Sequence, residues 1–297
     1  MIHALQTASI GIPIIRQGIA LFPTYVHQTM PCQIGSGSDV LEVTEVDGGV
    51  VPVLRVTNHG SALVLLPEGE TVVGGRQNRV LNVSVLVPGD RTIDIPVSCV
   101  ERGRWNEGHR FERAEFKATR RVRRAMIDGV QDNLRRGGHK TADQGRVWSE
   151  IDHELQRFAA PNATAALPAV RDHRRDTGAM QAIDELLTRG PLPQQCGVVI
   201  ARGSRIVGAE VFATPALFAD NWRSIVTSAM LEADGRPGRP SATRALAFLH
   251  RLASGPARRD SGVGVGHEVH VRTRSLVGQA LMFDEVVVHA SAFALAA

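Results

Sequence analysis

The hydrophobic and polar positions of this chain change their period twice along its length. From Ile10 to Trp105, short apolar runs, either alternating or continuous, are divided by turn residues, which is the pattern of antiparallel strands. From about Glu112 to Arg189, apolar residues recur at three- and four-residue steps, as on one face of a helix. After Pro193 the strand-like runs return. The pattern therefore predicts an α+β protein.

Strand-like runs bracket the helical stretch on both sides, and this predicts how the chain is organised. We expect a single intertwined α+β domain over residues 1–297. An antiparallel, sandwich-like N-terminal half would carry inserted helices, and the C-terminal strands would return to its β core. The alternative is a β lobe over residues 1–110 followed by a mixed α+β lobe over residues 111–297.

Residues that favour helix starts support this division. Thr141, with Gln144 three residues later, resembles a capping box, and apolar residues follow it at helical spacing. Thr214 and Pro215 are a favourable N-cap and first helical residue, and Ser241 can cap a further helix.

Two alternating segments carry polar residues where their apolar faces end. In the first, a stripe of leucine and valine from 81 to 87 continues backwards to Arg79 and Gln77. In the second, a stripe of isoleucine, valine and cysteine from 93 to 99 continues forwards to Glu101. Turn residues separate the two segments and favour an antiparallel hairpin, which places Gln77 and Arg79 beside Glu101. We therefore expect a polar pocket at the rim of a sheet.

Glu101 is the candidate catalytic group. Its carboxylate could act as a general acid or base, with a pKa tuned by apolar surroundings and by the positive charge of Arg79. The alternative is a structural ion pair of these two residues in a half-buried sheet. Replacing Glu101 by Gln distinguishes the two. A structural pair predicts a loss of about 3 to 5 kcal/mol in the free energy of unfolding. A functional carboxylate predicts a change within about 1 kcal/mol and loss of binding or turnover.

The neighbouring polar residues suit ligand binding. Gln77 and Asn78 supply amide donors and acceptors for hydroxyl-rich or amide ligands, and Arg102 and Arg104 can clamp a diphosphate bidentately. By strict alternation these two arginines lie on the opposite side of the strand from Glu101. They reach the same pocket only if the strand has ended or bulged by that point.

Two further residues stand out on predicted strands. Glu210 interrupts the apolar side of the run Arg205 to Ala213 and is a candidate ligand-binding residue for the same reason as Glu101. Cys99 could be a nucleophile with His109 or His289 as its base, but a cysteine on an apolar stripe is more often a packed hydrophobe.

A metal site is only weakly suggested. His267, Glu268 and His270 are close in sequence, but strand residues three apart point to opposite faces and the helical HExxH spacing is absent. We therefore predict no metal.

Composition narrows the class of protein. At 297 residues with 43% hydrophobic residues, the chain can bury a sizeable core. The net charge of +4 comes largely from arginines at 120, 121, 123 and 124, which could meet nucleic-acid phosphates. A charged run on a predicted helix is usually its solvated face, and aromatic residues make up only 4%, so a nucleic-acid partner is disfavoured.

No apolar run approaches the roughly 18 to 20 residues that span a bilayer, and the three cysteines are far apart. We expect a cytoplasmic protein without a membrane partner.

Two motifs carry a family resemblance. A Gly-Gly-Arg-Gln-Asn-Arg run occupies 74–79, and an Ile-Pro-Val-Ser-Cys-Val-Glu-Arg-Gly-Arg-Trp run occupies 95–105. Both are long and unusual, and they resemble the ADP-ribosylglycohydrolase and rhodanese-phosphatase associated protein domain. The resemblance extends over nearly the whole chain. It assigns membership of the motif, without a catalytic role, to Gln77, Asn78, Arg79, Glu101, Arg102, Arg104 and Trp105.

The resemblance implies a link to enzymes of ADP-ribose and NAD metabolism. The leading hypothesis is binding, with hydrolysis or other processing as a further step, of an ADP-ribose-like or related phosphorylated nucleotide around Gln77, Arg79 and Glu101. Arginines would hold phosphate, amides would contact ribose or base, and Glu101 would transfer a proton or position water. The alternative is a non-catalytic ligand-sensing or protein-interaction domain. The sequence specifies neither a cofactor nor an oligomeric state.

Overall fold

The structure, a computed structural model, describes residues 1–37, 39–46, 49–105, 110–159 and 179–295. It is an α+β fold of predominantly antiparallel sheets, which confirms the fold class predicted from the sequence. The chain divides into two compact units. The first unit contains Met1–Gln33, Gln181–Gly262 and Gly266–Ala297, and the second contains Ile34–Met180 and Val263–Val265.

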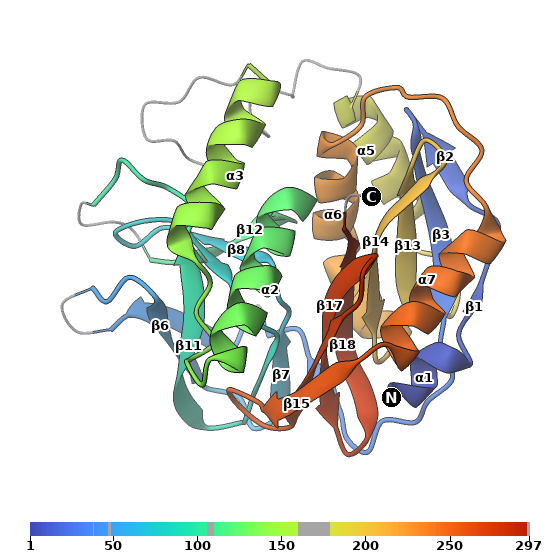
Figure 1. Cartoon of the computed structure of the whole chain (residues 1–297). Helices are drawn as coiled ribbons and strands as arrows, with labels where there is room; N and C mark the ends of the chain where they lie inside the picture. Colours follow the sequence, from blue (N-terminus) through green and yellow to red (C-terminus); the bar gives the residue numbers. More distant parts are fainter. Residues whose placement is uncertain (38, 47–48, 106–109, 160–178, 296–297) are drawn as a thin grey trace. The chain divides into compact units, whose positions relative to one another are not determined.

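The first unit is built on one large sheet with the strand order β1-β3-β13-β14-β18-β17-β16-β15, and β2 pairs with β3. Helices α1 and α7 pack together, and α7 also contacts strands of this sheet (Figure 1). Phe22, Val211, Phe248 and Leu252 belong to the resulting core. The elements of this unit are α1 His3–Gln6, β1 Ser9–Ile10, β2 Ile14–Arg16, β3 Ile19–Tyr25, α5 Ala179–Arg189, β13 Gly197–Arg202, β14 Arg205–Phe212, α6 Pro215–Leu231, α7 Ala242–Ser254, β15 Ala257–Ser261, β16 His267–Arg272, β17 Leu276–Phe283 and β18 Val286–Ala294.

The two helix starts predicted for this unit are confirmed. The side chain of Thr214 accepts a hydrogen bond from the backbone N–H of Leu217 at 3.2 Å, with Pro215 as the first helical residue of α6. Ser241 accepts in the same way from the N–H of Arg244 at 3.3 Å at the start of α7. Each hydroxyl satisfies one of the otherwise unpaired amides of the first turn.

The second unit contains a larger and a smaller sheet. The larger has the strand order β12-β8-β9-β11-β6-β5, and the smaller has the order β10-β7-β4. Helices α2 and α3 pack side by side (Figure 1). The elements are β4 Ile34–Gly35, β5 Leu41–Glu45, β6 Val53–Asn58, β7 Leu63–Leu66, β8 Glu70–Val73, β9 Arg79–Leu81, β10 Val85–Val87, β11 Arg91–Cys99, β12 Glu112–Lys117, α2 Arg120–Arg135 and α3 Gln144–Arg157.

The pairing of β9 with β11 is the one expected for the open end of the predicted hairpin. Cys99 pairs with Arg79 and Val97 pairs with Leu81 in an antiparallel register. The first segment is not one strand through Val87, however, because the chain bends after Leu81 and β10 joins the smaller sheet. The buried Asn82 lies at this bend and accepts a hydrogen bond from the Ser98 hydroxyl at 2.7 Å.

The helices of the second unit depart from the sequence prediction in two places. The N-cap of α3 is Asp143, whose carboxylate accepts from the N–H of Arg146 at 3.1 Å, and not Thr141. The arginines of α2 are not all on a solvated face either. Arg123 is buried and donates from Nε and Nη2 to the two carboxylate oxygens of Glu68, at 3.1 and 2.7 Å. A bidentate carboxylate compensates the desolvation of this guanidinium.

Across the described residues, the structure contains no helix that is long and apolar enough to cross a membrane.

Candidate functional site

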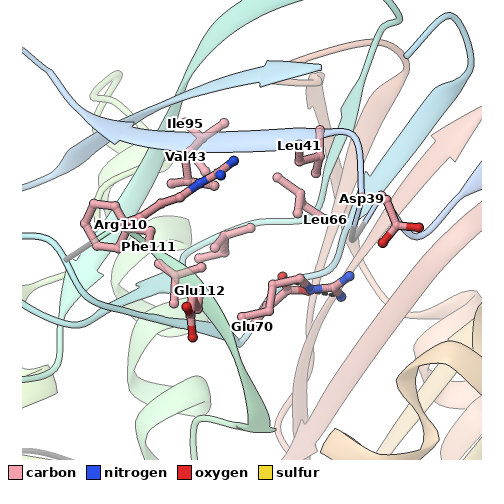
Figure 2. Close-up of a pocket in the computed structure, with 13 residues that line it drawn as sticks. Asp39, Leu41, Val43, Leu66, Glu70, Ile95, Arg110, Phe111 and Glu112 are labelled. Atoms are coloured by element: carbon pink, nitrogen blue, oxygen red, sulfur yellow. Dashed lines mark hydrogen bonds and ion pairs between the residues drawn. The ribbon is translucent and has the colours of Figure 1, made fainter. Parts of the chain in front are cut away.

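The larger sheet of the second unit is curled like a half-barrel. Its two edge strands, β12 and β5, are at opposite ends of the strand order, yet residues of both line the same cavity. The cavity has a volume of about 410 Å³. In Figure 2, Arg110 and Phe111 lie on one side, Leu41 and Val43 lie on the strand across from them, and Asp39 lies at the far end.

The lining of this cavity combines an apolar floor with charged groups. The described residues that line it are Gly37, Asp39, Leu41, Val43, Leu66, Glu70, Val72, Leu81, Ile95, Arg110, Phe111, Glu112 and Arg113. The guanidinium of Arg113 is fixed in place, because it pairs with Glu70 at 2.6 Å and donates to the backbone carbonyl of Ser36 at 2.7 Å. An apolar floor with a few placed polar groups is the usual character of a small-molecule site.

None of the candidate site residues singled out from the sequence is among the described residues that line the cavity. A hydrogen-bonded group, here called the motif cluster, is formed instead by the buried residues Gln77, Arg79, Cys99 and Glu101 together with the partly exposed Arg104. The strands that line the cavity lead to it, since Leu81 lies two residues from Arg79 on β9. The predicted convergence of polar residues at a strand end is therefore observed, but beside the cavity.

Gln77 links the members of the motif cluster. Its side-chain oxygen accepts from Arg79 Nη1 and from the Cys99 thiol, both at 3.1 Å, and its amide nitrogen donates to the backbone carbonyl of Glu101 at 2.9 Å. Gln144 of α3 makes a similar connection, because its side chain accepts from the N–H of Cys99 at 2.9 Å and donates to the carbonyl of Cys99 at 2.8 Å. The Gln144 side chain thus satisfies the backbone N–H and carbonyl of Cys99, as a neighbouring strand would.

Glu101 pairs directly with Arg104 and not with Arg79. Its carboxylate oxygen Oε2 accepts from Arg104 Nε at 2.8 Å and from the N–H of Asn78 at 3.2 Å. Strand β11 ends at Cys99, so the chain can turn and bring Arg104 back to the side of Glu101. The condition stated from the sequence, that the strand must have ended by this point, is met for Arg104.

Arg104 also holds the glycine loop of the first motif. Its Nη1 donates to the carbonyl of Gly75 at 2.7 Å, and its Nη2 donates to Asn78 Oδ1 at 3.1 Å and to the carbonyl of Gly74 at 3.2 Å. Gly75 has φ +48°, and a Cβ there would lie 2.1 Å from Cζ of Phe111. The glycine loop therefore lies directly against a ring that lines the cavity.

Arg79 is fully buried but incompletely paired. The carboxylate oxygen Oε2 of Glu45 lies 3.9 Å from its Nη2, and its guanidinium carbon lies 5.9 Å from the centre of the Trp105 ring. Burial lowers the pKa of Arg79, against smaller opposing contributions from Cys99 and Glu45. Trp105 itself is 43% exposed.

Arg102 turns away from the motif cluster. It pairs with Asp152 of α3 at 2.8 Å in an exposed ion pair, and its guanidinium lies over the ring of Trp148 at 5.1 Å. The two arginines expected to clamp one diphosphate therefore take different partners.

Cys99 has the environment of a packed thiol. It is fully buried, its thiol donates to Gln77 Oε1 and to the carbonyl of Glu101 at 3.1 Å, and burial raises its pKa. A reactive cysteine needs a lowered pKa and access to solvent. Of the bases considered for it, His109 lies outside the described residues and His289 belongs to the first unit.

Glu210 lies in the first unit. It is buried on β14, with the imidazole Nε2 of His289 at 3.5 Å from its carboxylate. On the same sheet, His270 and Glu268 of β16 are joined by a 2.9 Å hydrogen bond. In the part of the chain that the structure describes, no group of three or more His, Cys, Asp or Glu side chains could hold a metal ion.

The cavity-lining residues were missed by sequence reasoning. Leu41 and Val43 alternate with polar residues as an amphipathic strand would, but nothing local shows that they face Phe111 some 70 residues later. Only the curl of the sheet brings these segments together.

The model of the ARG and Rhodanese-Phosphatase-superfamily-associated Protein domain matches residues 7–293 of the chain. Neither the curated proteins nor the solved structures contain a significant match.

Proposed function

The chain belongs to the ARG and Rhodanese-Phosphatase-superfamily-associated Protein domain family, and from this premise we propose that its second unit binds a small phosphorylated, ADP-ribose-like nucleotide in the cavity of the curled sheet. The class of ligand is suggested by the family name and by the lining of the cavity. From the sequence, the ligand was expected at the motif cluster. The ligand site proposed from the structure is instead the adjoining cavity.

The observation that carries the proposal is the composition of the cavity wall. A volume of about 410 Å³ lies in the lower part of the range of small-molecule sites, roughly 300 to 1,000 Å³. Phe111 and the apolar floor suit a planar base. Arg110 and Arg113 suit a phosphate, and the carboxylates of Asp39 and Glu112 can accept hydrogen bonds from ribose hydroxyls.

The charge balance makes the proposal specific. Glu70 already pairs with Arg113, and further carboxylates line the cavity, so a bare polyanion would meet repulsion as well as attraction. A ligand that combines phosphate with hydroxyl donors should bind more tightly than inorganic pyrophosphate. The geometry favours binding over turnover, because the carboxylate of Glu101 is engaged by Arg104 and Asn78 and does not line the cavity.

Calorimetric titration of the purified protein with ADP-ribose, AMP, ribose 5-phosphate and pyrophosphate tests the proposal. Val43→Phe places a ring in the cavity, and Thr44→Phe on the opposite, exposed face of β5 is its matched control. We expect the first variant to weaken nucleotide binding at least tenfold and the second to leave it unchanged. Chromatography of the same mixtures for new products separates binding from hydrolysis.

Two results would overturn the proposal. One is the absence of binding by every nucleotide up to millimolar concentration. The other is binding that Val43→Phe does not weaken, which would place the ligand elsewhere. Binding without products supports the ligand-sensing alternative, and binding with products adds processing to the same site.

A further inference from the structure

Arg79 presents unused hydrogen-bond donors in the interior of the second unit. Its side chain is 0% exposed, and only Nη1 has a hydrogen-bond partner within the described ranges, while Nε and Nη2 have none. Oε2 of Glu45, 3.9 Å from Nη2, is likewise buried without a hydrogen-bond partner among the described residues. A buried donor or acceptor that is left unpaired destabilises the folded protein, so an arrangement that leaves both unpaired calls for an explanation.

The two arginines of the second motif show that unpaired guanidinium donors are not a general property of this region. Arg104 uses Nε, Nη1 and Nη2 in hydrogen bonds to Glu101, Asn78 and two glycine carbonyls. Arg102 pairs with Asp152 at 2.8 Å, and its exposed guanidinium can also be solvated. Arg79 is the most buried of these three arginines, so its unpaired donors have no such access to water.

The two unused groups specify the chemistry that would satisfy them. Nε and Nη2 form one edge of the guanidinium, which offers parallel N–H groups to an acceptor. Beside this edge, Glu45 Oε2 needs a donor. A carboxamide offers a carbonyl oxygen and an N–H about 2.2 Å apart, as the C=O and C–N bond lengths require. Two hydrogen bonds that diverge slightly from the oxygen and nitrogen of the carboxamide can reach Arg79 Nη2 and Glu45 Oε2, which lie 3.9 Å apart.

An anion fits this arrangement less well. A carboxylate or phosphate would accept from Arg79 but would place a second negative charge against Glu45. The exposed ring of Trp105 adds a surface on which a planar group can stack, because it lies over Arg79 and Arg76 and is 43% exposed.

We propose that Arg79 and Glu45, beneath Trp105, form a second binding site that takes an uncharged planar group with an adjacent acceptor and donor, such as an aromatic carboxamide or the edge of a nucleobase. The carbonyl oxygen accepts from Arg79, the N–H donates to Glu45, and the ring stacks on Trp105. Because Arg79 is fully buried, the indole of Trp105 moves when the group enters. This site does not depend on ligand binding in the cavity.

Benzamide and benzoate are the matched probes, because they share a ring and differ in the donor. In an NMR titration of the ¹⁵N-labelled protein, benzamide should shift the indole N–H resonance of Trp105 and leave that of the buried Trp222 in place. For so small a ligand we expect a dissociation constant on the order of 1 mM. Benzoate and inorganic phosphate should bind at least tenfold more weakly.

Glu45→Gln is the decisive variant. The substituted side chain would keep the acceptor for the N–H of Arg76, which Glu45 Oε1 accepts at 3.0 Å, and would present a donor in place of Oε2. It should therefore reverse the preference, so that benzoate binds more tightly than benzamide. Glu42→Gln, on the outer face of the same strand, is the control and should retain the wild-type preference. Arg79→Lys should abolish binding of both probes if the variant folds.

The proposal is overturned if benzamide leaves the Trp105 resonance unchanged up to tens of millimolar, or if Glu45→Gln leaves the order of the two probes unchanged. Failure of the cavity proposal is a separate result, because Val43→Phe should weaken nucleotide binding without altering the benzamide titration.

Discussion

Replacing Glu101 by glutamine tests whether the motif cluster is chiefly structural. Glutamine has the shape of glutamate and keeps a carbonyl oxygen, so it can still accept from Arg104 Nε and from the N–H of Asn78. What it loses is the negative charge. Hydrogen bonds to charged groups contribute about 1.5 to 3 kcal/mol and neutral ones about 0.5 to 1.5 kcal/mol, so each bond is weakened by about 1 kcal/mol.

The expected loss for Glu101→Gln is therefore about 1 to 3 kcal/mol. It falls below the 3 to 5 kcal/mol typical of breaking a fully buried pair, because the Arg104 side chain is 25% exposed and keeps its bonds to the glycine loop. It lies between the two outcomes expected from the sequence, which were a loss of about 3 to 5 kcal/mol for a structural pair with Arg79 and a change within about 1 kcal/mol for a catalytic Glu101. Glu101→Ala, which removes the acceptor as well, should cost more than Glu101→Gln.

Urea denaturation followed by circular dichroism measures these differences. Asp152→Asn is the control, because it removes the charge that pairs with Arg102 in an exposed ion pair and should cost no more than about 1 kcal/mol. The structural interpretation is refuted if Glu101→Gln is as stable as Asp152→Asn while nucleotide binding is lost. In that case Glu101 would contact the ligand, as the sequence suggested.

Further predictions concern stability and thiol reactivity. The hydrogen bond from Arg202 lowers the pKa of Asp234 from 3.8 to about 2. The stability that this ionised carboxylate contributes is therefore present above about pH 4 and is lost as the pH falls through about 2. In urea titrations between pH 5 and 2, Asp234→Asn should remove this part of the acid dependence, which is less than about 1 kcal/mol. Ellman's reagent should modify the exposed Cys32 rapidly and reach the two buried thiols only on unfolding, and rapid modification of a second thiol in the native protein would contradict the packed environments described above. Gly75→Ala should cost about 2 to 5 kcal/mol in urea denaturation, because it combines a left-handed backbone with overlap of Phe111, and a loss below 1 kcal/mol would show that the ring moves aside.

The sequence predicted those features of the fold that depend on neighbouring residues. The period-2 stripes became core positions, since Leu81, Ile95 and Val97 are all buried in one cluster. The caps at Thr214 and Ser241 were correct because a hydroxyl next to a helix start acts on amides only two or three residues away. The break after Leu81 could not be predicted, because it depends on the side chain of Asn82 finding a partner on another strand.

The candidate site divides in the same way. Alternation correctly located Gln77, Arg79 and Glu101 at one end of paired strands. It could not identify the partner of Glu101, because that depends on a turn after β11 that brings Arg104 back across the strand. Whether a cavity adjoins these residues depends on how strongly the sheet curls, and that is a property of all its strands together.

The separation of motif and cavity bears on what the family resemblance can indicate. The motif residues hold a glycine loop and a strand end in place, and most of their polar groups are satisfied within the protein. The cavity is lined largely by residues before and after the two motif runs, at 37–43 and 110–113. A chain could therefore keep both motifs, and with them the curled sheet, while its ligand changed through these two segments.

We expect the motif to identify the scaffold, and residues such as Asp39, Arg110 and Glu112 to determine which ligand it binds. Arg110→Glu should accordingly change ligand preference without the loss of stability expected for Glu101→Gln, because Arg110 is exposed at the cavity wall and Glu101 is 5% exposed within the scaffold. An equal loss of stability in both variants would contradict this division.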